Sequence, residues 1–135
     1  MESANLMTGD WVIYPINIPK NPKVRITEIR KDGIKVCVKN ETFSAEGVDV
    51  ECLQPILLTP EILEKNGFNK DNGGEECWGC KIGWLTPHEY DDSFEVKSWE
   101  TEILGEPNSF SGVINYVHQL QHALKLCEFD KEIVL

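Results

Sequence analysis

The longest stretch with a single period of apolar positions lies near the C-terminal end of the chain, at residues 111–127. Its apolar residues recur at spacings of four, three, four and three, which is the repeat of an amphipathic helix. Ser109 and Ser111 lie at the start of this repeat, and each offers an N-cap oxygen. We therefore predict a helix over residues 111–127 that is buried along Val113, Val117, Leu120, Leu124 and Cys127.

The polar face of this predicted helix carries two histidines. At 100° per residue, His118 and His122 cluster with Lys125 on the side opposite the apolar residues. We expect this face to point outward, away from the core. A polar helix face is usually plain solvated surface, and here it is also a candidate binding surface made of His118, Gln121, His122 and Lys125.

Alternating apolar and polar residues in the first sixty positions predict a series of short β-strands. The Asp32-Gly33 pair between two of these runs is typical of a tight hairpin turn. Four or five short strands in so short a segment favour a small antiparallel β-barrel or a curled sheet. The runs expected to form strands are residues 9–14 (after an entering turn), 24–30, 34–38, 42–45 and 48–51.

The middle of the chain carries the signals of a short helix. Thr59 can act as the N-cap, and Pro60 suits the first helical position. Asn66-Gly67 ends the helix, because glycine readily takes the left-handed conformation. Residues 69–76 predict a mobile loop. Residues 77–85 and 93–104 then predict two strands, with a slip of phase in the second that indicates a bulge.

These elements define an α+β fold. It comprises an N-terminal small antiparallel β-barrel or curled sheet, a short middle helix, further antiparallel strands and a C-terminal amphipathic helix. We assign residues 1–58 to a small antiparallel β subdomain. Residues 59–135 form an α+β subdomain made of a helix, a β-hairpin and the C-terminal helix. We expect the two subdomains to share one core.

The composition is that of an ordinary globular protein, with 41% hydrophobic and 27% charged residues among 135. No apolar run approaches the roughly 20 residues that span a bilayer. The first ten residues have neither the basic start nor the apolar segment of a secretory signal. Five cysteines are an odd number and do not predict a disulfide framework. We therefore expect a reduced, cytoplasmic protein with no membrane segment.

The formal net charge of −10 is unevenly distributed. Residues 1–40 carry seven basic and four acidic side chains, whereas residues 41–135 carry six and nineteen. A net acidic chain is poorly suited to binding along a phosphate backbone. Two nucleic-acid-related alternatives remain: mimicry of DNA by the acidic part, and contact with DNA or RNA through a local basic patch. The patch would comprise Lys20, Lys23, Arg25, Arg30, Lys31, Lys35 and Lys39.

Two residue pairs have the spacing of zinc ligands. They are Cys77 and Cys80, in Cys-Trp-Gly-Cys, and His118 and His122, in a His-x-x-x-His arrangement. In a zinc finger about twelve residues separate the two pairs, whereas thirty-seven lie between Cys80 and His118 here. We therefore favour separately placed cysteines and surface histidines, and keep a small zinc-stabilised module as an alternative.

The known catalytic motifs do not fit this chain. A Cys-x-x-Cys redox pair needs a lowered thiol pKa, and the preceding Glu75 and Glu76 disfavour the thiolate. A metalloprotease helix needs a carboxylate directly after its first histidine, where this chain has Gln119. The sequence shows no phosphate-binding glycine loop, nucleophile elbow or dinucleotide fingerprint. We assign no catalytic or cofactor-binding residue and lean against an enzyme.

Three segments resemble a family of uncharacterised small proteins from Bacteroides-type genomes, their phages and mobile elements. They are Gly9-Asp10-Trp11-Val12, residues 56–68 (ILLTPEILEKNGF) and residues 114–124 (INYVHQLQHAL). Family members open with a short Gly-Asp or Gly-Asn β segment, carry P-I-x-L-T-x-E-x-L-x-K-x-G-F and end on a Y-V-H-x-L-Q helix. Residues 69–108 are the variable part. The resemblance implies phage or mobile-element ancestry and assigns no activity or functional residue.

The combined interpretation is a non-enzymatic cytoplasmic accessory protein of phage or mobile-element origin that acts by binding another protein. It is based on the acidic surface, the small β first half and the lack of a catalytic motif. Besides the outward helix face, the expected contacts are exposed aromatics of the variable segment, Trp78 and Trp84.

Overall fold

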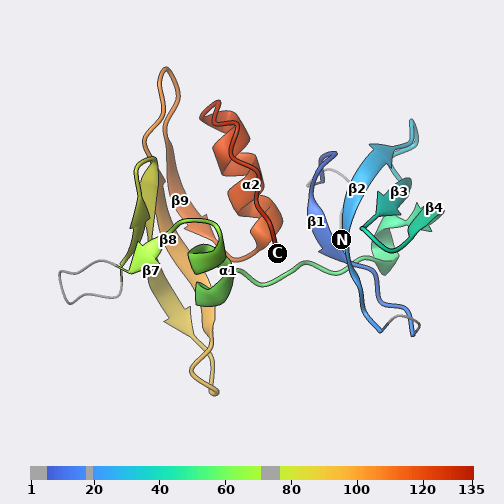
Figure 1. Ribbon diagram of the computed structural model, residues 1–135, viewed down its shortest axis with the longest axis horizontal. Helices are drawn as coiled ribbons and strands as arrows, with labels where there is room; N and C mark the ends of the chain where they lie inside the picture. Colours follow the sequence, from blue (N-terminus) through green and yellow to red (C-terminus); the bar gives the residue numbers. More distant parts are fainter. Residues whose placement is uncertain (1–5, 18–19, 71–76) are drawn as a thin grey trace. The chain divides into compact units, whose positions relative to one another are not determined.

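The computed structural model describes residues 6–17, 20–70 and 77–135. The chain forms two compact units, Met1–Ile56 and Leu57–Leu135, whereas the sequence places the boundary after Leu58. The elements (Figure 1) are, in chain order, β1 (Trp11–Ile13), β2 (Lys23–Ile29), β3 (Lys35–Lys39), β4 (Ser44–Asp49), the 3₁₀ helix η2 (Val50–Cys52), α1 (Pro60–Lys65), β5 (Asn69–Lys70), β6 (Trp78–Cys80), β7 (Gly83–Tyr90), β8 (Val96–Ile103), β9 (Phe110–Ile114) and α2 (Val117–Leu126).

The N-terminal unit is a four-stranded antiparallel sheet in the order β1-β2-β3-β4. The predicted turn between β2 and β3 is held by the Asp32 carboxylate, which accepts the N–H groups of Ile34 (2.8 Å) and Lys35 (3.3 Å). These bonds stabilise the ionised form and hold the pKa of Asp32 below its ordinary value. Gly33 takes a left-handed φ of 70° here, as the Asp-Gly signal requires.

One face of this sheet forms the core of the N-terminal unit, because its apolar residues alternate with polar ones. The two runs predicted at 42–45 and 48–51 belong to a single strand, β4, which continues into η2. β1 and β4 do not pair with each other in the described residues, so the sheet is open and not a closed barrel. The buried set is Leu6, Val12, Val24, Ile26, Val36, Val38, Val48, Val50 and Leu53.

The C-terminal unit is a five-stranded antiparallel sheet in the order β5-β6-β7-β8-β9, with α2 beside it (Figure 1). Trp99 on β8 is fully buried, and its indole N–H donates to the carbonyl oxygen of Leu58 (2.9 Å). That bond holds the segment before α1 against the sheet. The remaining core comprises Leu63, Phe68, Leu85, Val96, Ile103, Ile114, Val117, Leu120, Ala123, Leu124, Cys127 and Ile133.

The structure confirms the predicted middle helix in detail. The hydroxyl of Thr59 accepts the N–H of Ile62 (3.3 Å) as an N-cap. Pro60 is the first helical residue, Asn66 is the C-cap and Gly67 follows with a φ of 87°. All these signals act within the helix and its two ends. Packing against other elements therefore does not change where the helix begins or ends.

The predicted start of the C-terminal helix is wrong. Residues 110–114 form β9, the edge strand beside β8, so Val113 lies on a strand and is 52% exposed. The helix begins only at Val117, because Oε1 of Gln119 accepts the N–H groups of Asn115 (2.6 Å) and Tyr116 (3.0 Å). The N-cap is therefore Tyr116, in place of the two serines predicted for that role.

The strand predicted at 77–85 is also wrong in part. It is a hairpin, β6 and β7, that turns at Lys81-Ile82, and Pro87 lies within β7 and not in the following turn. The predicted bulge is confirmed by register shifts between β7 and β8 near Glu89. Of the predicted loop, Asn69 and Lys70 form β5, and residues 71–76 lie outside the described residues. The α+β fold class is confirmed by two antiparallel sheets and two α-helices in the described residues.

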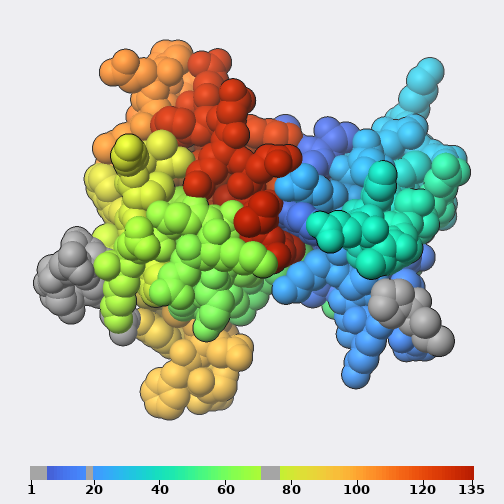
Figure 2. All heavy atoms as spheres, viewed as in Figure 1, coloured from blue at the N-terminus to red at the C-terminus, as the bar shows by residue number. Residues whose placement is uncertain are grey.

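The segment after α2 is fixed to the end of α1. The side-chain amide of Asn66, which is only 5% exposed, donates to the carbonyl oxygens of Ile62 (2.7 Å) and Val134 (2.8 Å). Its oxygen accepts the N–H of Val134 (2.8 Å). Figure 2 shows this red C-terminal tail alongside the green atoms of α1. We call residues 128–135 the tail.

Replacing Asn66 with alanine removes all three of these hydrogen bonds, and we expect the free energy of unfolding to fall by about 2–3 kcal/mol. Urea denaturation followed by tryptophan fluorescence measures the change. The matched control is Asn69→Ala, at an exposed position on β5, which should change stability by less than about 0.5 kcal/mol. An equal loss in both variants would show that Asn66 does not hold the tail.

The turn between β7 and β8 is closed by another carboxylate. Oδ1 of Asp91 accepts the Ser93 hydroxyl (2.7 Å) and the N–H groups of Ser93 and Glu95 (both 2.9 Å). The Ser93 hydroxyl is the largest cause that holds the pKa of Asp91 below its ordinary 3.8. Phe94, between these partners, has a φ of 63° and is 86% exposed.

Replacing Ser93 with alanine should raise the pKa of Asp91 toward 3.8. Because the folded pKa is lowered, the stabilisation is complete above the unfolded pKa and is lost as the pH falls through the folded value. In Ser93→Ala the loss should therefore be smaller, and it should be complete at a higher pH than in the parent protein, because the folded pKa lies closer to the unfolded value. Carboxyl-carbon NMR titration measures the pKa directly, and an unchanged value in the variant would contradict the assigned cause.

Candidate functional site

The helix face predicted to carry two outward histidines is only partly exposed. Lys125 is exposed and His122 is half-buried, but His118 is 4% exposed, so its predicted outward position is wrong. The His118 ring stacks on Tyr116 (centroids 5.8 Å apart, 9° between planes) and meets the His122 ring edge-on (5.6 Å, 73°). Aromatic packing therefore buries His118. Gln121, the fourth predicted contact, is half-buried.

The four candidate zinc ligands do not come together. Cys77 and Cys80 are half-buried residues at β6, whereas His118 and His122 lie on α2. No three His, Cys, Asp or Glu side chains in the described ranges gather closely enough to hold a metal ion. All five cysteines, including this pair, are free thiols.

The two tryptophans predicted as contacts lie on opposite faces of the C-terminal sheet. Trp78 is opposite the fully buried Leu85 in the β6–β7 register, so its side chain is on the inner face. Trp84 is opposite Glu102 in the β7–β8 register and is 39% exposed on the outer face. Only Trp84 is therefore available as an outer-face contact, and Trp78 is half-buried.

Trp84 borders a shallow cavity of about 330 Å³ on the outer face of β7, β8 and β9, which we call the sheet groove. Two cross-strand rows form its floor. One row contains Trp84, Glu102 and Ser111, and the next contains Thr86, Glu100 and Val113. The full lining is Trp84, Thr86, Glu100, Thr101, Glu102, Ser111, Gly112 and Val113.

The sheet groove is apolar at two places and negatively charged between them. Trp84 on β7 and Val113 on β9 present exposed apolar side chains. Glu100 and Glu102 project from β8, which lies between these two strands. Nδ1 of His88 lies 3.4 Å from Oε1 of Glu100 at the end of the groove. Such a surface suits a partner that combines apolar and basic groups.

Two glycines adjoin Trp84, Gly83 directly before it in the chain and Gly79 opposite it on β6. A Cβ at Gly83 would lie 2.2 Å from the carbonyl oxygen of Glu102, so only glycine allows β7 to approach β8 this closely. Gly79, opposite Trp84 on β6, is less crowded, because a Cβ there would have no neighbour nearer than 3.8 Å.

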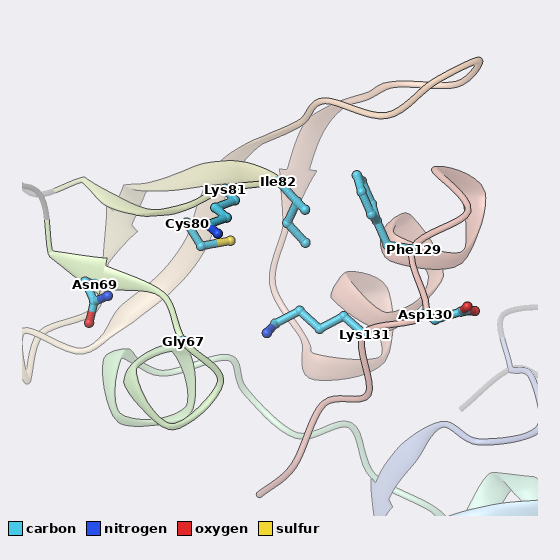
Figure 3. Close-up of a pocket in the computed structure, with 8 residues that line it drawn as sticks. All are labelled: Gly67, Asn69, Cys80, Lys81, Ile82, Phe129, Asp130 and Lys131. Atoms are coloured by element: carbon cyan, nitrogen blue, oxygen red, sulfur yellow. The ribbon is translucent and has the colours of Figure 1, made fainter.

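A second, larger cavity of about 510 Å³ lies between the β6–β7 turn and the tail (Figure 3). We call it the tail cavity. It is lined by Gly67, Asn69, Cys80, Lys81, Ile82, Phe129, Asp130 and Lys131.

The basic hairpin of the N-terminal unit also carries carboxylates. Lys35 lies 3.6 Å from Asp49, and Glu28 is opposite Cys37, whose thiol donates to it (3.8 Å). The guanidinium of Arg25 lies 4.7 Å from the centre of the Trp11 ring. The acidic residues interrupt the basic surface that a phosphate backbone would need.

Comparisons of the chain with family models, with curated proteins and with solved structures gave no match. Within the described residues, no helix is both long and apolar enough to cross a membrane.

Sequence reasoning identified Trp84 but missed the rest of the sheet groove. The alternation of residues 93–104 places Glu100 and Glu102 on one face, which is a visible signal. Ser111 and Val113 carry no such signal, because their spacing fits the helical repeat that follows them. Only pairing with β8 shows that these two residues belong to the sheet.

Substituting alanine at Gly83 should force β7 away from β8 and lower the free energy of unfolding by about 3 kcal/mol. Gly79→Ala, on the neighbouring strand, is the matched control and should cost less than about 1 kcal/mol. Thermal and urea unfolding of the two variants compare these costs. Equal tolerance of alanine at both positions would contradict the close approach at Gly83.

Proposed function

We propose that the protein is a non-enzymatic accessory protein that binds another protein through the sheet groove. The observation that carries the proposal is the exposure of Trp84 (39%) and Val113 (52%) on either side of a cavity in an open sheet face. Tryptophan is enriched among the residues that dominate binding energy at protein interfaces. A single apolar residue on a protein surface is normal. Two exposed apolar residues on either side of one groove, however, are the arrangement that we assign to a docking surface.

The charge of the groove defines the kind of partner. Glu100 and Glu102 lie between the two apolar residues, and residues 57–135 carry fifteen acidic side chains against six lysines. Complementary charge directs encounter and fixes orientation more than it adds affinity. The fitting partner is therefore an extended protein segment that presents an apolar side chain next to lysine or arginine.

The proposed location and origin are based on other observations. Five free cysteines, spread over both units, suit the reducing cytoplasm. The proposal of phage or mobile-element origin is based on the resemblance of residues 56–68 and 114–124 to the family described above. The non-enzymatic assignment is based on the lack of a recognised catalytic motif in the sequence. At position 119, for example, a metalloprotease helix would need a carboxylate, and this chain has glutamine.

A labelled peptide of alternating lysine and apolar residues tests this proposal by fluorescence anisotropy. Trp84→Ala should weaken binding at least tenfold, because it removes the main apolar contact. Glu100→Gln with Glu102→Gln should weaken it about tenfold and reduce its salt dependence. A peptide with glutamate in place of lysine should not bind.

The matched control is Glu89→Gln with Glu95→Gln, which removes the same charge from exposed positions outside the groove. This control should bind within twofold of the parent protein. Equal weakening by the two pairs would show general charge attraction and contradict the groove as the docking site. Duplex DNA provides a second comparison: salt-dependent DNA binding would instead favour the nucleic-acid alternative.

A further inference from the structure

We propose that the tail cavity binds a small molecule that carries a carboxylate on an apolar body. Three segments of the C-terminal unit form the cavity: the end of α1 with β5, the β6–β7 turn and the tail. Its volume of about 510 Å³ lies within the range of about 300–1,000 Å³ typical of small-molecule sites. The cavity is separate from the sheet groove and shares no lining residue with it.

Apolar side chains form the walls of the cavity. Ile82 comes from the β6–β7 turn and Phe129 from the tail, and both are half-buried. In Figure 3 they lie on opposite sides of the same space, and the Cys80 side chain lies beside that of Lys81. An aromatic or aliphatic body between these walls would bury apolar surface on both sides, which is the main source of affinity for such a ligand.

Two lysines provide the charge that the ligand must balance. Lys81 lies on the turn and Lys131 on the tail, so cations approach the cavity from opposite sides. Nζ of Lys131 lies 3.6 Å from the position of a Cβ at Gly67. The carboxylate of Asp130 points away from the cavity in Figure 3. The lining therefore carries two lysines and one aspartate, in a unit with fifteen acidic residues and six lysines.

The lining favours a carboxylate over a phosphate. The lining side chains provide two ammonium groups and the amide of Asn69, without an arginine fork. Phosphate sites in proteins commonly add arginine forks or clustered backbone N–H groups to their lysines, because a phosphate has several oxygens to satisfy. A ligand with one carboxylate on an apolar body fits this lining. Its carboxylate would face the two lysines, and its body would lie between the apolar walls.

A titration with 4-phenylbutyrate, followed by amide NMR of the full chain, tests the proposal. We expect saturable shifts confined to the cavity residues, with a dissociation constant of about 1–5 mM for so small a probe. The isosteric probes 4-phenylbutan-1-ol and 4-phenylbutylamine keep the body but change the charge. The alcohol should bind at least fivefold more weakly, and the amine should not bind. Equal binding of acid and alcohol would overturn the proposal.

Measuring both ligand binding and the unfolding temperature of variants shows whether a lysine binds the ligand or only stabilises the fold. Lys81→Gln should weaken 4-phenylbutyrate at least fivefold without changing the unfolding temperature, because Lys81 is exposed. Ile82→Ala should weaken the acid and the alcohol alike. Lys97→Gln, an exposed lysine on β8, is the matched control and should bind as the parent protein does. Unchanged binding by Lys81→Gln would also overturn the proposal.

Discussion

The hydrogen bond from the buried indole of Trp99 to the carbonyl oxygen of Leu58 determines the arrangement of the C-terminal unit. A buried indole N–H requires an acceptor, so the segment before α1 must cross the inner face of the sheet. The N–H of Leu58 in turn donates to the carbonyl oxygen of Asn115, just before α2. One short segment therefore places both helices on the same side of β8.

This placement leaves the opposite face of the sheet uncovered by the unit's own helices. Along β8, Thr101 and Ile103 share the buried face, so Glu100 and Glu102 must project from the other. The register shifts near Glu89 change the phase of β8, so that Val96 and Trp99, three residues apart, are both buried. The features that form the sheet groove are thus consequences of how the core is buried.

The sequence predicts well what depends on neighbouring residues and less well what depends on pairing across the chain. The predicted bounds of α1 are correct, including both caps, because Thr59, Pro60 and Gly67 act on the helix ends beside them. The start of α2 is missed because Val113 fits the helical repeat as well as it fits a strand. Pairing with β8 decides between the two, and nothing in the segment itself encodes that pairing. The error at His118 has a different cause, since the rings of Tyr116 and His122 that pack on it are near neighbours in the sequence, and the helical repeat alone does not show this packing.

The candidate sites are harder to predict than the fold for the same reason. Trp78 and Trp84 are equally conspicuous in the sequence, and only the turn at Lys81-Ile82 places them on opposite faces. The tail cavity combines residues more than sixty positions apart, such as Gly67 and Lys131. The tail, which forms one wall, is bonded by Asn66, an asparagine that in the sequence looks like an ordinary helix C-cap. A single buried amide that bonds both the end of α1 and the tail therefore helps to hold one wall of this cavity in place.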